Sequence, residues 1–195
     1  MPELRLATPR DIPELEALID LSVRALSIGI YSPAQTEAAL VHMFGVDSQL
    51  VADGTYYVIV DESSLVAAGG WSARRTLYGG DQAKRETDSK LDPATMPARI
   101  RAFFVHPEWT RRGLARRIFA ECEAAARGSG FRDFELVSTL PGEPFYRALG
   151  FLPLEPIEIP LPGKVTLPCL RMHRPIADPE LTAIDNRRLI ENSDM

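Results

Sequence analysis

The segment from Phe104 to Arg117 constrains this chain more than any other. Its sequence, FVHPEWTRRGLARR, contains the end of an apolar strand, a short turn, one glycine and a predicted helix that begins among four arginines. The first backbone N–H groups of a helix have no partner within the helix, and the helix dipole places positive charge at the same end. A pyrophosphate satisfies both, so this order of strand, turn and helix predicts a site for a phosphorylated ligand.

The residue types in this segment suit such a ligand. Gly113 has no side chain to block the approach of a phosphate group, and Ala115 is nearly as small. The arginines add positive charge that phosphate oxygens prefer; they are Arg111, Arg112, Arg116 and Arg117. An arginine-rich, solvated surface helix with one glycine remains the alternative interpretation.

Two stretches together resemble the GNAT superfamily of N-acetyltransferases. Residues 110–115 (TRRGLA) are similar to its acetyl-CoA motif, Gln/Arg-x-x-Gly-x-Gly/Ala, although Thr110 departs from the first position. Residues 144–151 (PFYRALGF) are similar to its Phe-Tyr-x-x-x-Gly-Phe segment. The resemblance covers roughly residues 3–175. We therefore expect one acetyltransferase domain over 1–175 and a tail over 176–195 that is either a docked helix or disordered.

Composition narrows the remaining classes of protein. The chain has 195 residues, 45% of them apolar, with no apolar run near the ~20 residues of a membrane span and no signal-peptide pattern, so we expect a cytoplasmic protein without a membrane partner. A net charge of −5 argues against nucleic acid. The two cysteines form no disulfide framework, and no metal site is expected because the histidines are scattered, at His42, His106 and His173.

Hydrophobic spacing predicts the order of elements. Helix starts are expected at Thr8-Pro9 and Ser32-Pro33, and further helices at 114–127 and 144–149. The expected strands are 4–7, 55–60, 65–71, 99–105, 134–137, 157–161 and 165–172. This order predicts an α/β (α+β) fold with a mixed, mostly antiparallel sheet of about seven strands and helices on both faces. The resemblance adds a splay between the fourth and fifth strands.

Three local features stand out within this order. Gly69 and Gly70 inside a strand indicate a bulge or a close backbone approach. The alternation of side chains fails at 103–105, which indicates another bulge or burial of both faces. Residues 74–98 form a long polar connection that departs from the short hairpin of the family, and such loops usually have a functional reason.

The resemblance implies roles for particular residues. It places acetyl-CoA along the main chain of Phe103, Phe104 and Val105, over the residues Arg111, Arg112, Gly113, Leu114, Ala115 and Arg116, with Ser138 as a further contact. It makes Tyr146 the general acid that protonates the departing sulfur, because a phenol of pKa ~10 is still protonated at pH 7. Core packing for 103–105, a strand-end cap for Ser138 and a buried aromatic for Tyr146 remain the structural alternatives.

The acceptor side is less defined. Tyr31 and Trp71 are candidate walls of the substrate pocket, and a core position is the alternative for both. The predicted fourth strand carries Arg99 and Arg101 and no carboxylate, so the general base is open; Glu62, Glu143 and His42 are conceivable.

The leading hypothesis is an acetyl-CoA-dependent N-acetyltransferase that acts on a primary amine by direct attack. The amine can belong to a small molecule, a peptide N-terminus or a lysine, and a homodimer stays open. The alternatives are a transferase for another acyl-CoA and a non-catalytic CoA-binding sensor.

Overall fold

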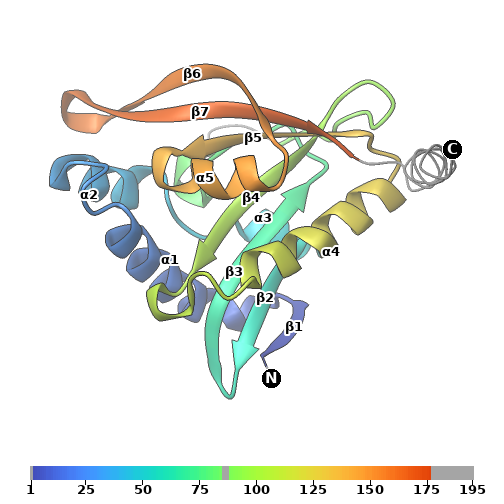
Figure 1. The fold of residues 1–195 in the computed structure, drawn as a ribbon, viewed down its shortest axis with the longest axis horizontal. Coiled ribbons are helices and arrows are strands. Elements are labelled where there is room, and N and C mark those ends of the chain that lie inside the picture. The colour runs from blue at the N-terminus through green and yellow to red at the C-terminus, as the bar shows by residue number, and fades with distance from the viewer. Residues whose placement is uncertain (1, 85–87, 177–195) are drawn as a thin grey trace, which may run out of the picture.

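The computed structural model describes residues 2–84 and 88–176. Within them, seven strands form one mixed sheet in the order β1-β2-β3-β4-β5-β7-β6 (Figure 1), which confirms the predicted fold class. The strands are β1 Glu3–Leu6, β2 Tyr56–Asp61, β3 Ser64–Ser72, β4 Ala98–Val105, β5 Asp133–Thr139, β6 Leu152–Leu161 and β7 Val165–Pro175. Neighbouring strands pair antiparallel except β4 and β5, which are parallel.

The helices begin where local sequence signals place them. A short 3-10 turn, Pro9–Asp11, leads into α1 Ile12–Leu26, and the Asp11 carboxylate accepts the N–H of Thr8 at 2.7 Å. Ser32 caps the next helix by accepting the N–H of Gln35 at 3.2 Å. The other helices are α2 Pro33–His42, α3 Ser48–Ala52, α4 Leu114–Gly128 and α5 Glu143–Ala148. Of these, α3 was not predicted.

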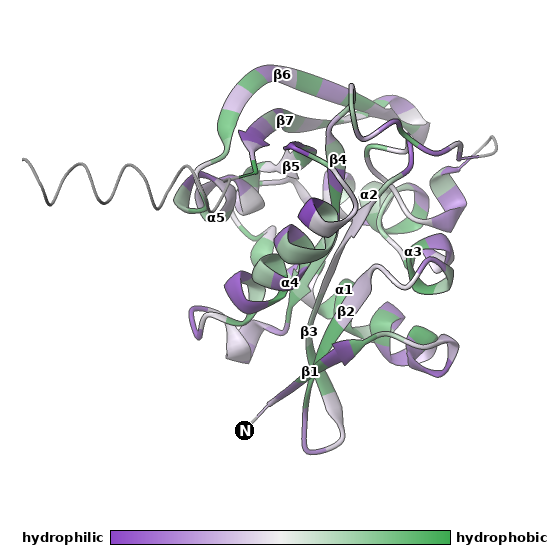
Figure 2. Cartoon of the chain, turned by 90° about the vertical axis from the view of Figure 1, so that its right-hand side faces the viewer, coloured by the Kyte–Doolittle hydropathy of each residue, from purple (hydrophilic) through white to green (hydrophobic). Residues whose placement is uncertain are grey.

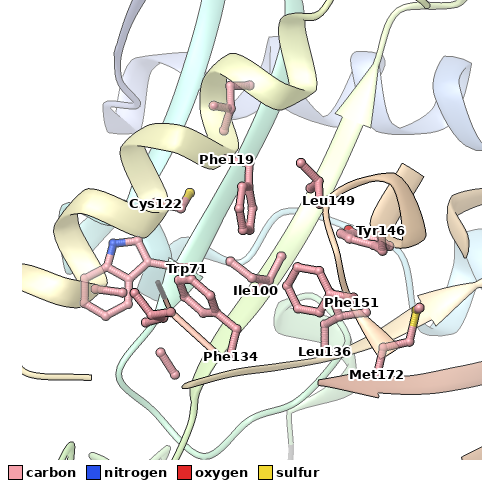
Figure 3. Packing of buried hydrophobic residues seen from close by; sticks show 14 of the residues in the cluster. Trp71, Ile100, Phe119, Cys122, Phe134, Leu136, Tyr146, Leu149, Phe151 and Met172 are labelled. Atoms are coloured by element: carbon pink, nitrogen blue, oxygen red, sulfur yellow. The ribbon is translucent and has the colours of Figure 1, made fainter. Parts of the chain in front are cut away.

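Helices cover both faces of the sheet because side chains alternate along its strands. Tyr56 and Val58 of β2 pack with α1 on one face, while Ile59 packs with α4 on the other. Figure 2 shows hydrophobic and hydrophilic bands alternating along α4, which buries Leu114, Ile118, Phe119, Cys122 and Ala126. Figure 3 shows Phe119 and Cys122 of α4 pointing toward Ile100 and Phe134 of the sheet.

The sheet opens between β4 and β5. The described residues of these strands pair at only two positions, Ala98 with Phe134 and Arg99 with Glu135. Beyond them the strands diverge, as Figure 1 shows. The splay that the resemblance implied is therefore present.

A β-bulge lies at the start of the opening. The register of β3 and β4 shifts between the pair Gly70–Arg101 and the pair Ala68–Phe104. Ala102 takes a left-handed φ of 54°, and its carbonyl accepts the hydroxyl of Tyr56 at 3.0 Å. A Cβ at Gly70 would lie 2.6 Å from Thr55 O, so the predicted close backbone approach is present there, while a Cβ at Gly69 would lie 2.8 Å from the ring of Phe103.

The β6–β7 hairpin closes the far side of the sheet and extends over α2 (Figure 1). Its outer strand is an edge, as predicted, and carries Pro153, Pro156 and Pro160. Proline lacks a backbone N–H, so this edge offers few donors to another strand.

The connection between β3 and β4 is fastened to the body of the protein. The N–H of Gly80 donates to Met43 O at 2.9 Å, that of Asp81 to Val46 O at 3.0 Å, and that of Leu91 to Ala73 O at 2.8 Å. Leu91 itself is buried in the core. A 3-10 turn, Asp81–Ala83, lies within this connection.

Two further expectations concern the C-terminal tail and membrane-spanning helices. The predicted tail falls almost wholly on 177–195, outside the described residues. None of the helices in residues 2–84 and 88–176 is long and apolar enough to cross a membrane.

Candidate active site

A cavity of about 750 Å³ occupies the opening between β4 and β5. One end lies at the turn before α4, where Trp109, Arg111 and Gly113 line it. At the other end its walls come from the end of α1, the α1–α2 connection and the β3–β4 connection. We call these the phosphate end and the far end. Tyr146 of α5 also lines the cavity.

The phosphate end has the backbone geometry of an anion site. Arg111 and Gly113 both have left-handed φ values, 62° and 79°, and Gly113 is the N-cap of α4 without any side-chain cap. The first backbone bond of the helix runs from Arg117 N–H to Gly113 O at 3.0 Å, so the N–H groups of Leu114, Ala115 and Arg116 precede the helical ladder. A Cβ at Gly113 would meet no atom within 4 Å, so the space beside this glycine is open.

The four arginines of this segment take different positions. Arg111 and Arg116 line the cavity, and Arg116 also donates to Ala148 O at 3.3 Å. The guanidinium carbon of Arg112 lies 4.5 Å from the centre of the Trp109 ring, and Arg112 does not line the cavity. Arg117 donates to Pro2 O at 2.8 Å. The structure thus brings two of the four to the cavity directly.

Tyr146 has a buried ring and an uncommitted hydroxyl. Its ring packs against Phe103, Phe145 and Phe151 with centroid distances of 6.3, 5.1 and 5.7 Å. Among the described residues, its hydroxyl makes no hydrogen bond. Burial raises the pKa of this phenol above its usual value, so the group stays protonated throughout the neutral range.

The other predicted cofactor contacts also surround the cavity. Phe103, Phe104 and Val105 line it, and the N–H of Val105 donates to Ser22 Oγ at 3.3 Å. Ser138 lines it as well, is 1% exposed and donates its hydroxyl to Thr139 O at 2.7 Å. The side chain of Ser138 therefore already has a local partner.

The two aromatic residues predicted as pocket walls differ. Tyr31 lines the far end, where its hydroxyl donates to Pro168 O at 2.6 Å and accepts the N–H of Leu140 at 2.9 Å. Trp71 does not line the cavity; it packs edge-on against Phe131 at 5.9 Å. Figure 3 shows Trp71 and Tyr146 at opposite ends of the core cluster.

A buried ion cluster supports the far end and was not foreseen from the sequence. Arg101 lines the cavity and donates to the Asp47 carboxylate at 2.9 Å and to Thr76 O at 2.7 Å. Lys84 forms an ion pair with the other oxygen of Asp47. Desolvation lowers the pKa of the Arg101 guanidinium, although Asp47 opposes this shift.

The conceivable general bases do not line the cavity. Glu62, His42 and Glu143 are absent from its walls, and the Glu143 carboxylate accepts from Arg147 at 2.7 Å. Across residues 2–84 and 88–176, no cluster of His, Cys, Asp and Glu could hold a metal ion.

Comparisons with known proteins point to one family. A family model described as an acetyltransferase (GNAT) domain matches residues 52–153. No curated protein sequence matches the chain.

Solved structures share the fold at low sequence identity. A GCN5-related N-acetyltransferase from Rhodopseudomonas palustris aligns with a TM-score of 0.66 at 18% identity, covering 90% of this chain and 96% of its own. An N-acetyltransferase from Thermoplasma acidophilum in complex with coenzyme A aligns at 0.60 and 14%, covering 90% and 99%. A phosphinothricin acetyltransferase from Sinorhizobium meliloti in complex with AcCoA aligns at 0.56 and 19%, covering 90% and 89%.

Proposed function

Because the chain belongs to the GNAT family of acetyltransferases, we propose that it transfers an acetyl group from acetyl-CoA to a primary amine by direct attack. The observation that carries this proposal is a single cavity that joins the open N-terminus of α4 to Tyr146, whose hydroxyl has no hydrogen-bond partner in the described part of the chain.

The residues at the phosphate end fit acetyl-CoA. The N–H groups at the start of α4 and the side chains of Arg111 and Arg116 would hold the pyrophosphate, because unpaired donors and positive charge meet there. The diverging edges of β4 and β5 would take the amide-bearing arm of the ligand. Two structures of similar fold are described as complexes with coenzyme A and with AcCoA, which supports this assignment.

When bound, acetyl-CoA supplies an acetyl thioester: the amine nitrogen bonds to its carbonyl carbon, the carbon–sulfur bond breaks, and overall one proton passes from nitrogen to sulfur. Tyr146 would donate its proton to the departing sulfur; burial keeps the phenol neutral, and the raised pKa also makes it a weaker acid. The phenolate then recovers from water the proton that nitrogen releases. A backbone N–H near the β4 bulge would stabilise the developing oxyanion, a kind of contact typically worth ~3 kcal/mol.

Ligand binding and turnover test the proposal separately. Acetyl-CoA at about 100 times its Kd should stabilise the protein by ~2.7 kcal/mol, while free acetate should not. Release of free thiol in the presence of a panel of amines then measures transfer. A protein without any thermal shift in millimolar acetyl-CoA would contradict the proposal. A shift without thiol release from any amine would favour the sensor alternative.

A further inference from the structure

The charges around the cavity bear on which amine can enter it. The cavity walls formed by residues 2–84 and 88–176 contain no Asp, Glu or His. Their titratable and charged groups are the phenols of Tyr31, Tyr78 and Tyr146 and the guanidinium groups of Arg101, Arg111 and Arg116. Arg111 and Arg116 lie at the phosphate end, where the pyrophosphate is proposed to bind, and Arg101 is paired with Asp47. A bound ammonium ion would therefore find no carboxylate among these walls, which costs free energy in a partly desolvated site.

Two carboxylates that adjoin the cavity walls are committed to other partners. Asp47 lies behind Arg101, is 1% exposed, and is paired with both Arg101 and Lys84. Glu143 follows the wall residue Gly142 in the chain, but its carboxylate is held by Arg147. Neither carboxylate lines the cavity, and each is already in an ion pair.

An amine must then lose its proton without help from the described walls. An alkylamine with the pKa of lysine, ~10.4, is neutral in only about 1 molecule in 2,500 at pH 7. An α-amino group of pKa ~7.7–8.0 is neutral in about 1 in 6 to 1 in 11. The same cavity would therefore meet the neutral form of the weaker base more than a hundred times as often.

Apart from Arg101, which is paired with Asp47, the far end is also apolar. Its walls include Leu26, Tyr31, Met43, Phe44, Leu77 and Tyr78. Each methylene that an acceptor buries against such walls adds roughly fourfold in affinity. A second charged group on the acceptor would lose its hydration there without gaining a partner.

From these features, and resting on the proposed function, we propose that the acceptor is a weakly basic primary amine, such as an α-amino group, that carries an apolar substituent and no second positive charge. Polyamines and lysine side chains fall outside this class. The acceptor is free or at the N-terminus of a peptide; the chemistry at the nitrogen is the same.

Matched acceptors separate basicity from apolar contact. Phenylalaninamide and 2-phenylethylamine share a ring but differ in basicity, while phenylalaninamide and glycinamide share basicity but differ in the ring. At pH 7 we expect kcat/KM for phenylalaninamide to exceed that of each partner by at least tenfold, and that of spermidine by more. Between pH 7 and 9 the value for 2-phenylethylamine should rise about tenfold per unit, while that for phenylalaninamide levels off near pH 8.

A binding measurement and a charge variant give readouts beyond turnover. Calorimetric titration of the CoA-saturated protein should show tighter binding of phenylalaninamide than of 2-phenylethylamine or spermidine at pH 7. Tyr78 lines the far end and is 38% exposed, so it tolerates a polar replacement. Tyr78→Glu should shift preference toward 2-phenylethylamine and spermidine by about tenfold, and Tyr78→Gln, which lacks the charge, should not.

The possible results distinguish the proposed acceptor class from the proposed acetyltransferase activity. Faster acetylation of spermidine or of a lysine in an N-terminally blocked peptide, with phenylalaninamide a poor acceptor, would overturn the acceptor class and leave the acetyltransferase intact. Absence of an acetyl-CoA thermal shift would overturn the proposed function itself, and the acceptor class with it. A peptide Phe-Ala-Ala that outperforms phenylalaninamide would support the class and assign it to peptide N-termini.

Discussion

At the scale of single residues, the ring of Tyr146 serves packing and its hydroxyl is proposed to serve the chemistry. Its ring fills the core between Phe103 and Phe151, while its hydroxyl has no partner within the described residues. We therefore expect Tyr146→Phe to lower kcat by ~10²–10⁴ while the Kd for acetyl-CoA and the melting temperature stay nearly unchanged. Steady-state kinetics, equilibrium binding and thermal melting measure the three quantities.

Tyr31 is the natural control for this variant. Its hydroxyl makes two hydrogen bonds, to Pro168 O and Leu140 N, so Tyr31→Phe should lower the free energy of unfolding by about 1–3 kcal/mol. If Tyr146→Phe keeps full turnover when chemistry limits the rate, Tyr146 is structural and water or another group protonates the sulfur.

Gly113 tests the phosphate end. A Cβ there points into open space, so Gly113→Glu should place a negative side chain where the pyrophosphate is proposed to lie and abolish the acetyl-CoA thermal shift. Gly113→Ala is the matched control because both variants bear the same strain at a φ of 79°. The alanine variant should retain most of the shift. Equal thermal shifts in the two variants would move the phosphate site elsewhere.

At the scale of elements, the connection between β3 and β4 depends on the cluster around Asp47. Asp47→Asn should leave the buried guanidinium of Arg101 without its counter-ion and lower the free energy of unfolding by about 3–5 kcal/mol. It should also raise the KM of the acceptor, because Leu77 and Tyr78 of this connection wall the far end, with little change in acetyl-CoA affinity.

Asp53→Asn is the comparison, since the Asp53–Arg74 pair joins the same connection to the body of the protein with side chains 24% and 19% exposed. It should cost about 1 kcal/mol or less in urea unfolding. Equal losses in both variants would show that the Asp47 cluster has no special role.

The elements also show how far sequence reasoning reaches. The strand, glycine turn and helix around Gly113 were predicted because their signals are local, and so were the capped starts of α1 and α2. The helix α3 was missed because five residues give too short an apolar pattern. The Asp47–Arg101 pair was missed because its partners lie 54 residues apart, and no local pattern records which distant charges meet. Trp71 was predicted to line the substrate pocket, but it packs in the core. An aromatic residue on an inner strand can face either a pocket or the core, and the sequence does not distinguish the two.

At the scale of the whole molecule, ion pairs make stability depend on acidity. The hydrogen-bonded Arg5 guanidinium holds the pKa of the Asp11 carboxyl well below its ordinary value, and Arg74 lowers the pKa of Asp53. A depressed pKa contributes stability that is complete above the unfolded pKa, ~3.9, and is lost as pH falls below it. The midpoint of urea unfolding should stay nearly level, as far as these groups act, from pH 7 to about pH 5 and fall steeply by pH 3. Asp11→Asn should flatten that fall, and an unchanged slope would exclude Asp11 as a contributor.

The sparse pairing of β4 with β5 has a mechanical consequence. Two pairs, Ala98–Phe134 and Arg99–Glu135, are the direct ladder between one half of the sheet and the other in the described chain, so the sheet resembles two plates joined by a short seam at one end. If the amide-bearing arm of acetyl-CoA bonds to both halves of the sheet beyond these two pairs, it would hold the halves together. The rigidity of the sheet would then depend on the concentration of acetyl-CoA, and slower amide exchange in β5 and β7 would report that it is bound.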